Sequence, residues 1–132
     1  MTRKILVADD EAHILHVVSM KLTNAGYEVL TAMDGEETLE LCAAERPDLM
    51  ILDYQMPLYN GTEVCLRLRE MEHMREVPVI MLTARGFEID RSEMETAGIS
   101  VELTKPFSPR ELLEAVNALL EKSEQKADAE AT

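Results

Sequence analysis

The chain has 132 residues, of which 46% are hydrophobic, and a formal net charge of −13. This length and apolar content predict a single folded domain with a substantial core, and they exclude a disordered chain. The strong negative charge argues against direct binding to nucleic acid through an electropositive surface.

The amino terminus and the cysteines indicate the cellular compartment. Residues 1–4 lead straight into a short apolar run, without the pattern of a secretory signal, and no apolar run is long enough to span a bilayer. Cys42 and Cys65 are isolated and lack paired spacing, which is typical of reduced thiols. We therefore expect a cytoplasmic protein without membrane insertion.

Hydrophobic periodicity predicts five strands that alternate with five helices. Strands are expected at residues 4–8, 27–31, 48–53, 77–83 and 100–104. Helices are expected at residues 12–25 and 86–97, and others begin at Asp34, Asn60 and Ser108, each of which precedes an acid by three residues. Residues 1–122 would form the domain, and residues 123–132, with three acids and one base, a flexible acidic tail.

The run that ends at Asp53 is apolar without interruption and lies between Pro47 and Pro57. A strand with no polar alternation is typical of a parallel sheet that is covered by helices on both faces. In open sheets of this kind, ligands bind at the carboxyl ends of the strands. Asp53 would lie at such an end, although an aspartate there can also simply cap a turn.

Polar residues follow four of the five predicted strands. They are Asp9 and Asp10 after the first strand, Asp53 at the third, Thr83 at the fourth and Lys105 after the fifth. Each of them alone would be an ordinary cap, strand end or solvated lysine. In a parallel sheet all of them meet at one edge, so the joint arrangement favours a functional site.

Three clustered carboxylates repel one another unless a proton or a cation relieves the repulsion. Oxygen ligands of this kind suit Mg²⁺, which is commonly held by carboxylates, water and phosphate oxygens. A metal, an ammonium group and a hydroxyl together can stabilise the charge of a phosphoryl group in transfer, and a central carboxylate can be the nucleophile. The sequence thus predicts phosphoryl chemistry at this edge.

Five ordered segments of the sequence form a recognisable pattern: Ile5-Leu-Val-Ala-Asp9-Asp10-Glu11, Ile51-Leu-Asp53-Tyr-Gln-Met-Pro57 with Gly61, Leu82-Thr83-Ala84, Ala97-Gly98 and Leu103-Thr-Lys105-Pro106-Phe107. Together these segments resemble the receiver domain of response regulators in two-component signalling. The resemblance covers about residues 3–121. It implies a single-domain, flavodoxin-like, doubly wound α/β fold with a five-stranded parallel sheet in the order 2-1-3-4-5.

The resemblance also implies the chemistry of the site. Asp53 would accept a phosphoryl group from a phosphohistidine on a sensor histidine kinase or a phosphotransfer protein. The carboxylates of Asp9, Asp10 and Asp53, with the backbone carbonyl of Gln55, would hold Mg²⁺ as the cofactor. The phosphorylated domain would then bind an unknown downstream protein, without direct contact to nucleic acid.

Further residues would switch or read out the phosphorylated state. Thr83 would bond one phosphoryl oxygen and Lys105 another, and the small side chain of Ala84 would leave room for the donor. Lys105-Pro106 resembles the family's cis junction. Glu102 stands where the family usually has an aromatic residue, and we expect it to reach solvent or to pair with a base such as Arg85.

Other functions stay open from the residues alone. A small-molecule phosphatase that uses an aspartyl nucleophile would place an acid two residues after Asp53, where this chain has Gln55. A flavodoxin would carry aromatic residues around a flavin, whereas aromatic residues make up 4% of this chain. A phosphorylation-independent scaffold is the remaining alternative. We expect no enzyme activity beyond Mg²⁺-dependent self-phosphorylation and self-dephosphorylation at Asp53.

Overall fold

The computed structural model describes the backbone of residues 2–131 and the side chains of residues 2–125. Within this described part, five strands alternate with five α-helices, as predicted. The strands are β1 (Lys4–Ala8), β2 (Glu28–Ala32), β3 (Leu49–Asp53), β4 (Val79–Thr83) and β5 (Val101–Thr104). The helices are α1 (Ala12–Asn24), α2 (Gly35–Glu45), α3 (Gly61–Leu68), the short 3-10 helix η1 (Glu72–Met74), α4 (Arg91–Ala97) and α5 (Pro109–Ala131).

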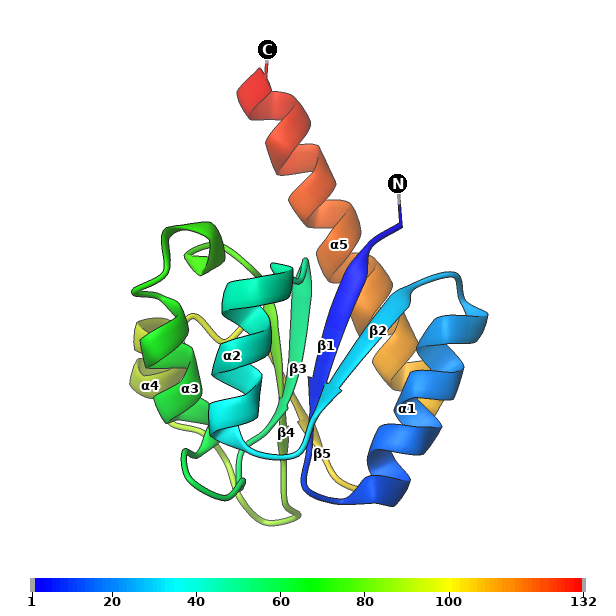
Figure 1. The fold of residues 1–132 in the computed structure, drawn as a ribbon, viewed down its shortest axis with the longest axis vertical. Helices are drawn as coiled ribbons and strands as arrows, with labels where there is room; N and C mark the ends of the chain where they lie inside the picture. The colour runs from blue at the N-terminus through cyan, green and yellow to red at the C-terminus, as the bar shows by residue number, and fades with distance from the viewer. Residues whose placement is uncertain (1, 132) are drawn as a thin grey trace.

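The strands form one parallel sheet in the order β2-β1-β3-β4-β5 (Figure 1). Next to the edge strand β2, Ile5 of β1 pairs with Val29 of β2 on one side and with Leu49 of β3 on the other. Each helix returns the chain to the edge at which the previous strand began, because parallel strands require a crossover connection. The predicted fold class, including the order 2-1-3-4-5, is confirmed.

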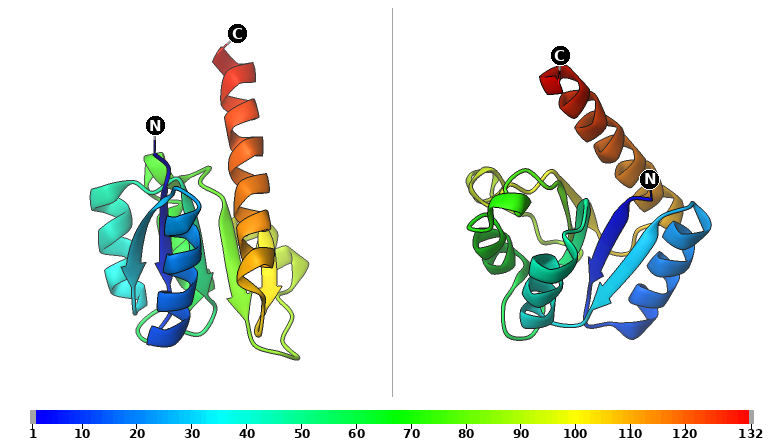
Figure 2. Two further views of the ribbon diagram at one scale, coloured as in Figure 1. Left: turned by 90° about the vertical axis from the view of Figure 1, so that its right-hand side faces the viewer. Right: turned by 45° about the horizontal axis from the view of Figure 1, so that its top comes forward.

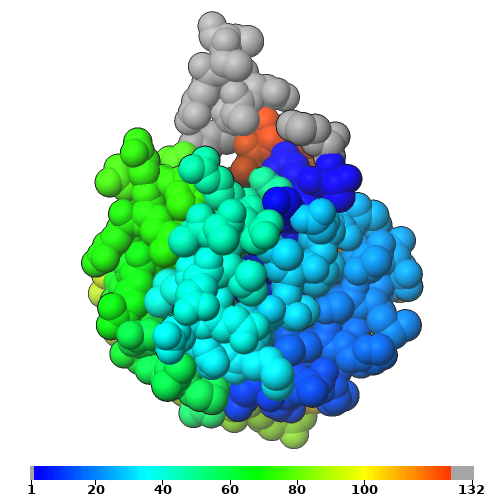
Figure 3. All heavy atoms as spheres, viewed as in Figure 1, coloured from blue at the N-terminus to red at the C-terminus, as the bar shows by residue number. Residues whose placement is uncertain are grey.

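Helices cover both faces of the sheet, which makes the fold doubly wound (Figures 1 and 2). Successive residues of β1 point to opposite faces: Ile5 and Val7 pack toward α1 and α5, whereas Leu6 and Ala8 pack toward α2, α3 and α4. In the space-filling view of Figure 3, side chains of α1, α2 and α3 conceal most of the strands. Every residue of β3 and β4 is therefore buried, which explains their uninterrupted apolar sequences.

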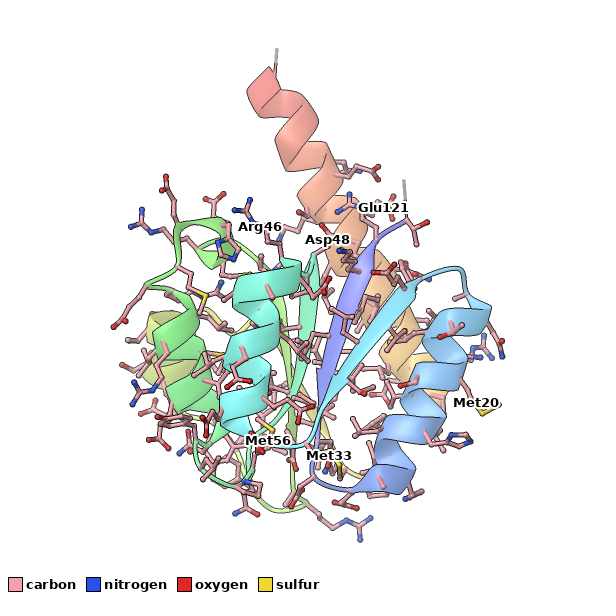
Figure 4. The ribbon with its side chains drawn as sticks, in the orientation of Figure 1. Met20, Met33, Arg46, Asp48, Met56 and Glu121 are labelled. Carbon is pink, nitrogen blue, oxygen red and sulfur yellow. The ribbon has the colours of Figure 1, made fainter. Side chains whose placement is uncertain are left out.

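The carboxyl ends of the strands lie together at one edge of the sheet. Met33 and Met56, which follow β2 and β3, mark this edge in Figure 4, and Arg46 and Asp48 mark the opposite one. Because β1, β3, β4 and β5 all end here, the edge collects the polar residues that follow them.

The predicted helix starts at Asp34 and Asn60 are confirmed as N-caps. Asp34 accepts a hydrogen bond from the backbone N–H of Glu37 at 2.8 Å. Asn60 forms a complete capping box, because it accepts from the Glu63 N–H while the Glu63 carboxylate accepts from the Asn60 N–H. The second cap fixes the chain that leaves β3 and so supports the segment that follows Asp53.

The fourth helix is shorter than predicted. It begins at Arg91 rather than at residue 86, and Asp90 caps it by accepting from the Ser92 N–H. Gly86 has φ +83°, a left-handed conformation that a helix cannot contain, so residues 84–90 form a loop. This loop lies directly after β4, at the edge where the polar residues gather.

The backbone of α5 stays helical to Ala131, across the segment for which a flexible tail was predicted. Alanine, glutamate, glutamine and lysine are frequent there and are good helix formers, which explains the continuation. A domain boundary at residue 122 stays a prediction. None of the described helices combines the length and the apolar character needed to cross a bilayer.

We predict that Asn60→Ala lowers the free energy of unfolding by about 1 kcal/mol, because the Glu63 N–H loses its acceptor. Urea denaturation of the variant and the wild type measures the change. Asn60→Asp keeps an acceptor oxygen and should restore most of the stability. Equal losses in Asn60→Ala and Asn60→Asp would show that the cap does not stabilise this helix.

Candidate functional site

Three aspartates meet at the carboxyl edge of the sheet. Asp9 is fully buried, Asp53 is 6% exposed and Asp10 is exposed. Each offers a carboxylate oxygen, and these oxygens all lie within 4.8 Å of one another. Asp9 follows β1, and Asp53 is the last residue of the adjacent strand β3, so the pairing of these two strands produces the cluster.

Asp10 and Asp53 line a cavity of about 300 Å³ that opens at this edge. Its lining comes from the ends of β1, β3, β4 and β5 and from the loops that follow them. The lining residues are Asp10, Glu11, Asp53, Tyr54, Gln55, Ala84, Phe87 and Lys105. The cavity is large enough for a group such as a phosphate with its metal and water.

Lys105 supplies positive charge to the cluster. Its Nζ lies 2.9 Å from Asp9 Oδ2, 3.3 Å from Asp53 Oδ2 and 3.2 Å from Glu11 Oε1. Burial alone would lower the pKa of Lys105, but its hydrogen bond to Asp9 and the charges of Asp53 and Asp9 outweigh burial and raise it. The ammonium group therefore stays charged beside the two buried carboxylates. The peptide bond from Lys105 to Pro106 is cis.

The carboxyl group of Asp53 has a raised pKa. Burial, and after it the charge of Asp9, raise its pKa to about 6, while Lys105 and the backbone N–H of Gln55 oppose the increase. The Gln55 N–H donates to Asp53 Oδ1 at 3.4 Å. The carboxylate form of Asp53 is therefore destabilised, and a further cation would favour it.

The donor set fits a hard divalent cation. The three aspartates offer only oxygen ligands, and Asp10 lies at the solvent-exposed side, where water can complete the coordination. The Lys105 ammonium group pairs with Asp9, Glu11 and Asp53, and Asp10 adds a further carboxylate to the cluster, so these carboxylates outnumber the ammonium group. Asp9, Asp10 and Asp53 can thus hold Mg²⁺.

Thr83 is fully buried at the end of β4, and its hydroxyl donates to Glu102 Oε2 at 2.9 Å. The other carboxylate oxygen, Glu102 Oε1, accepts from the backbone N–H of Ile89 at 3.3 Å. The expected pairing of Glu102 with Arg85 was therefore wrong, whereas the expected contact with solvent is met in part, because the side chain is not fully buried. Glu102 is half-buried and finds its partners in a strand-end hydroxyl and a loop N–H, which meet the hydrogen-bonding need of a partly buried carboxylate.

The cavity includes residues that the sequence did not single out. Glu11 pairs with Lys105, and its position directly after the two aspartates was the available signal. Phe87 packs on Tyr54 with ring centroids 4.6 Å apart, beside Asp53. This pair joins the loop after β4 to the segment after β3, a tertiary contact for which the sequence carried no signal.

The arrangement suits transfer of a phosphoryl group to a carboxylate. Asp53 presents a nucleophilic oxygen to a cavity that already holds an ammonium group and a cluster of metal-ligand type. Ala84, which lines the cavity, narrows it little. Five of the predicted site residues line one cavity: Asp10, Asp53, Gln55, Ala84 and Lys105. Asp9 is not in this lining but pairs with Lys105. Thr83 donates its hydroxyl to Glu102.

A protein-family model described as the response regulator receiver domain matches residues 5–117. The chain therefore belongs to the response regulator receiver domain family of two-component signalling.

Among curated proteins, it is 44% identical over 124 residues to the alkaline phosphatase synthesis transcriptional regulatory protein PhoP of Bacillus subtilis, covering 94% of this chain and 51% of that protein. It is 43% identical over 122 residues to the probable transcriptional regulator ycf27 of Cyanophora paradoxa, covering 92% and 50%. The chain spans about half the length of these relatives.

Solved structures agree with the family. The chemotaxis response regulator CheY4 of Vibrio cholerae matches with a TM-score of 0.84 and 34% identity, over 90% of this chain and 99% of that one. A CheY-like receiver domain protein of Methanospirillum hungatei matches with a TM-score of 0.87 and 28% identity, over 96% and 99%. The predicted family and receiver function are confirmed.

We predict that Asp53→Asn raises the free energy of unfolding at pH 7.5, without divalent metal, by about 1–3 kcal/mol. The asparagine side chain is uncharged, so its burial carries no charge-desolvation cost and it does not repel the carboxylate of Asp9. In the wild type, the folded state binds the Asp53 proton more tightly than the unfolded chain, whose carboxyl pKa is 3.8. The advantage of the variant is therefore complete above about pH 6 and shrinks as the pH falls toward about 4.

Urea denaturation of both proteins at pH 7.5 and at pH 4.5 measures this difference. An advantage that keeps the same size at both pH values would mean that the Asp53 charge is not its source.

Proposed function

We propose that Asp53 is the phosphoacceptor of this receiver domain and that its phosphorylation changes the surface offered to a partner. One observation carries the proposal: Asp53 opens into a cavity in which Lys105 lies 3.3 Å from its carboxylate and Asp9 and Asp10 complete an oxygen cluster. Nucleophile, counter-charge and metal-ligand oxygens are all in place before a donor arrives.

In the proposed reaction, an oxygen of Asp53 forms a bond to phosphorus while the bond from phosphorus to the donor's imidazole nitrogen breaks. The product is an acyl phosphate, and the departing imidazole takes a proton from solvent. The carboxylates of Asp9, Asp10 and Asp53 with the carbonyl of Gln55 would hold Mg²⁺, which supplies positive charge that offsets repulsion between carboxylate and phosphoryl oxygens.

The other predicted residues receive roles in the same proposal. Lys105 exchanges its contact with the free Asp53 carboxylate for one with a phosphoryl oxygen. Thr83 donates to another phosphoryl oxygen after its hydroxyl turns. Ala84 keeps the approach to Asp53 open. Glu102 belongs to the switch because it holds the Thr83 hydroxyl in this structure.

The donor in this proposal is a sensor histidine kinase or a phosphotransfer protein in the cytoplasm. The domain is not an enzyme on separate substrates, because its chemistry is limited to gaining and losing one phosphoryl group at Asp53. The named relatives are transcriptional regulators of about twice the matched length. With a net charge of −13, the present chain would act through a protein partner rather than on nucleic acid.

A phosphorylation-independent scaffold is not favoured. A scaffold needs no charged cavity, and burying Asp9 and Asp53 side by side costs stability that well-packed apolar residues would not. Chemistry at Asp53 would account for the presence of these carboxylates beside Lys105.

We predict that incubation with acetyl phosphate and Mg²⁺ adds one phosphate to the protein, as measured by intact mass. Asp53→Asn should remove the added mass, since it removes the nucleophile. Asp48→Asn is a matched control, because Asp48 lies at the opposite edge of the sheet and should leave phosphorylation unchanged. Undiminished phosphorylation of Asp53→Asn would place the acceptor elsewhere.

We also predict that millimolar Mg²⁺ raises the melting temperature. An ion that binds only the native state at a hundred times its Kd stabilises by about 2.7 kcal/mol, which corresponds to about 10 °C for a domain of this size. Asp10→Asn should shrink the increase, and Asp48→Asn should not. The same increase in wild type and Asp10→Asn would argue against a metal site at Asp10.

A further inference from the structure

Glu102 links two elements at the carboxyl edge of the sheet. It lies in β5 opposite Met81 of β4, two residues before the pair formed by Thr83 and Thr104. One carboxylate oxygen accepts the Thr83 hydroxyl at 2.9 Å and the other accepts the Ile89 N–H at 3.3 Å. The carboxylate thus binds the end of β4 and the loop of residues 84–90 at the same time.

The Thr83 hydroxyl has one proton and can donate one hydrogen bond at a time. In this structure the bond goes to Glu102, so it does not go to Asp53. A bond to a charged carboxylate is stronger than one between neutral groups. Thr83 is also fully buried, so water cannot readily replace Glu102 as its acceptor. Any other acceptor for this proton must therefore displace a charged, well-placed partner.

We propose that Glu102 is a positioning residue that holds the Thr83 hydroxyl in its resting orientation, so that a phosphoryl group on Asp53 must compete with Glu102 for the same proton. This inference rests on the proposed function of Asp53. The exchange replaces one charged acceptor by another, so the net gain from turning Thr83 is smaller than it would be without Glu102. Glu102 therefore lowers the affinity of the site for a phosphoryl group or for a mimic of it.

The exchange also reaches the loop of residues 84–90. When Thr83 leaves, the Glu102 carboxylate keeps only the longer bond to Ile89 and becomes free to turn toward solvent. The same loop carries Phe87, whose ring packs on Tyr54 beside the cavity. Occupation of Asp53 is thereby coupled through Thr83 and Glu102 to the loop that precedes α4.

The test is a double-mutant cycle read by the affinity for beryllofluoride, a mimic of the phosphoryl group, in Mg²⁺. The proteins are the wild type, Glu102→Gln, Glu102→Leu, Thr83→Val and Thr83→Val combined with each Glu102 variant. With Thr83 present, Glu102→Leu should bind beryllofluoride about tenfold more tightly, and Glu102→Gln, which keeps an acceptor but loses its charge, should give a smaller gain. With Thr83→Val, the same Glu102 changes should alter the affinity by no more than about twofold.

The Thr83→Val background separates positioning from other effects. If Glu102 acted only through its negative charge or on the stability of the fold, its removal would give the same gain in both backgrounds, and that result would overturn the inference. An unchanged affinity in Glu102→Leu with Thr83 present would overturn it as well. If the wild type bound beryllofluoride no better than Asp53→Asn, the proposed function itself would fail. Circular dichroism melting of each variant confirms that all are folded.

Discussion

The ammonium group of Lys105 joins the buried carboxylates of Asp9, which follows β1, and Asp53, which ends β3. Without it, two like charges would lie together where both side chains are largely buried, and at least one would tend to take up a proton. With it, the pKa of Asp53 is still raised to about 6. The site therefore keeps an excess of negative charge. A bound divalent cation would reduce this excess, either alone or together with a phosphoryl group. This electrostatic imbalance connects the fold to phosphoryl chemistry.

The parallel sheet is what creates the imbalance. Pairing of β1 with β3 brings Asp9 and Asp53 together, and β5 brings Lys105 to the same edge. These residues could be predicted because strands buried on both faces have continuous apolar sequences that stop at a polar residue. The neighbours of each strand could not be predicted from that pattern, since periodicity does not say which strands pair. The order 2-1-3-4-5 came from the family resemblance instead.

Local hydrogen bonds were predictable, and tertiary ones were not. The caps at Asp34 and Asn60 depend on residues three positions apart, so the sequence alone indicates them. The late start of α4 depends on the backbone conformation of Gly86. The partner of Glu102 depends on the pairing of β4 with β5 and on the path of the following loop. From the sequence, a charged residue such as Glu102 within a strand indicates only that its carboxylate needs a partner or contact with solvent.

Chemical trapping of the acyl phosphate would test the central claim about Asp53 most directly. Borohydride reduces an aspartyl phosphate to homoserine and leaves free carboxylates unchanged, so peptide mass spectrometry after treatment with acetyl phosphate and Mg²⁺ identifies the acceptor. The structure predicts homoserine at position 53 and unmodified aspartate at positions 9 and 10. Homoserine at another acidic residue, with Asp53 unmodified, would contradict the account.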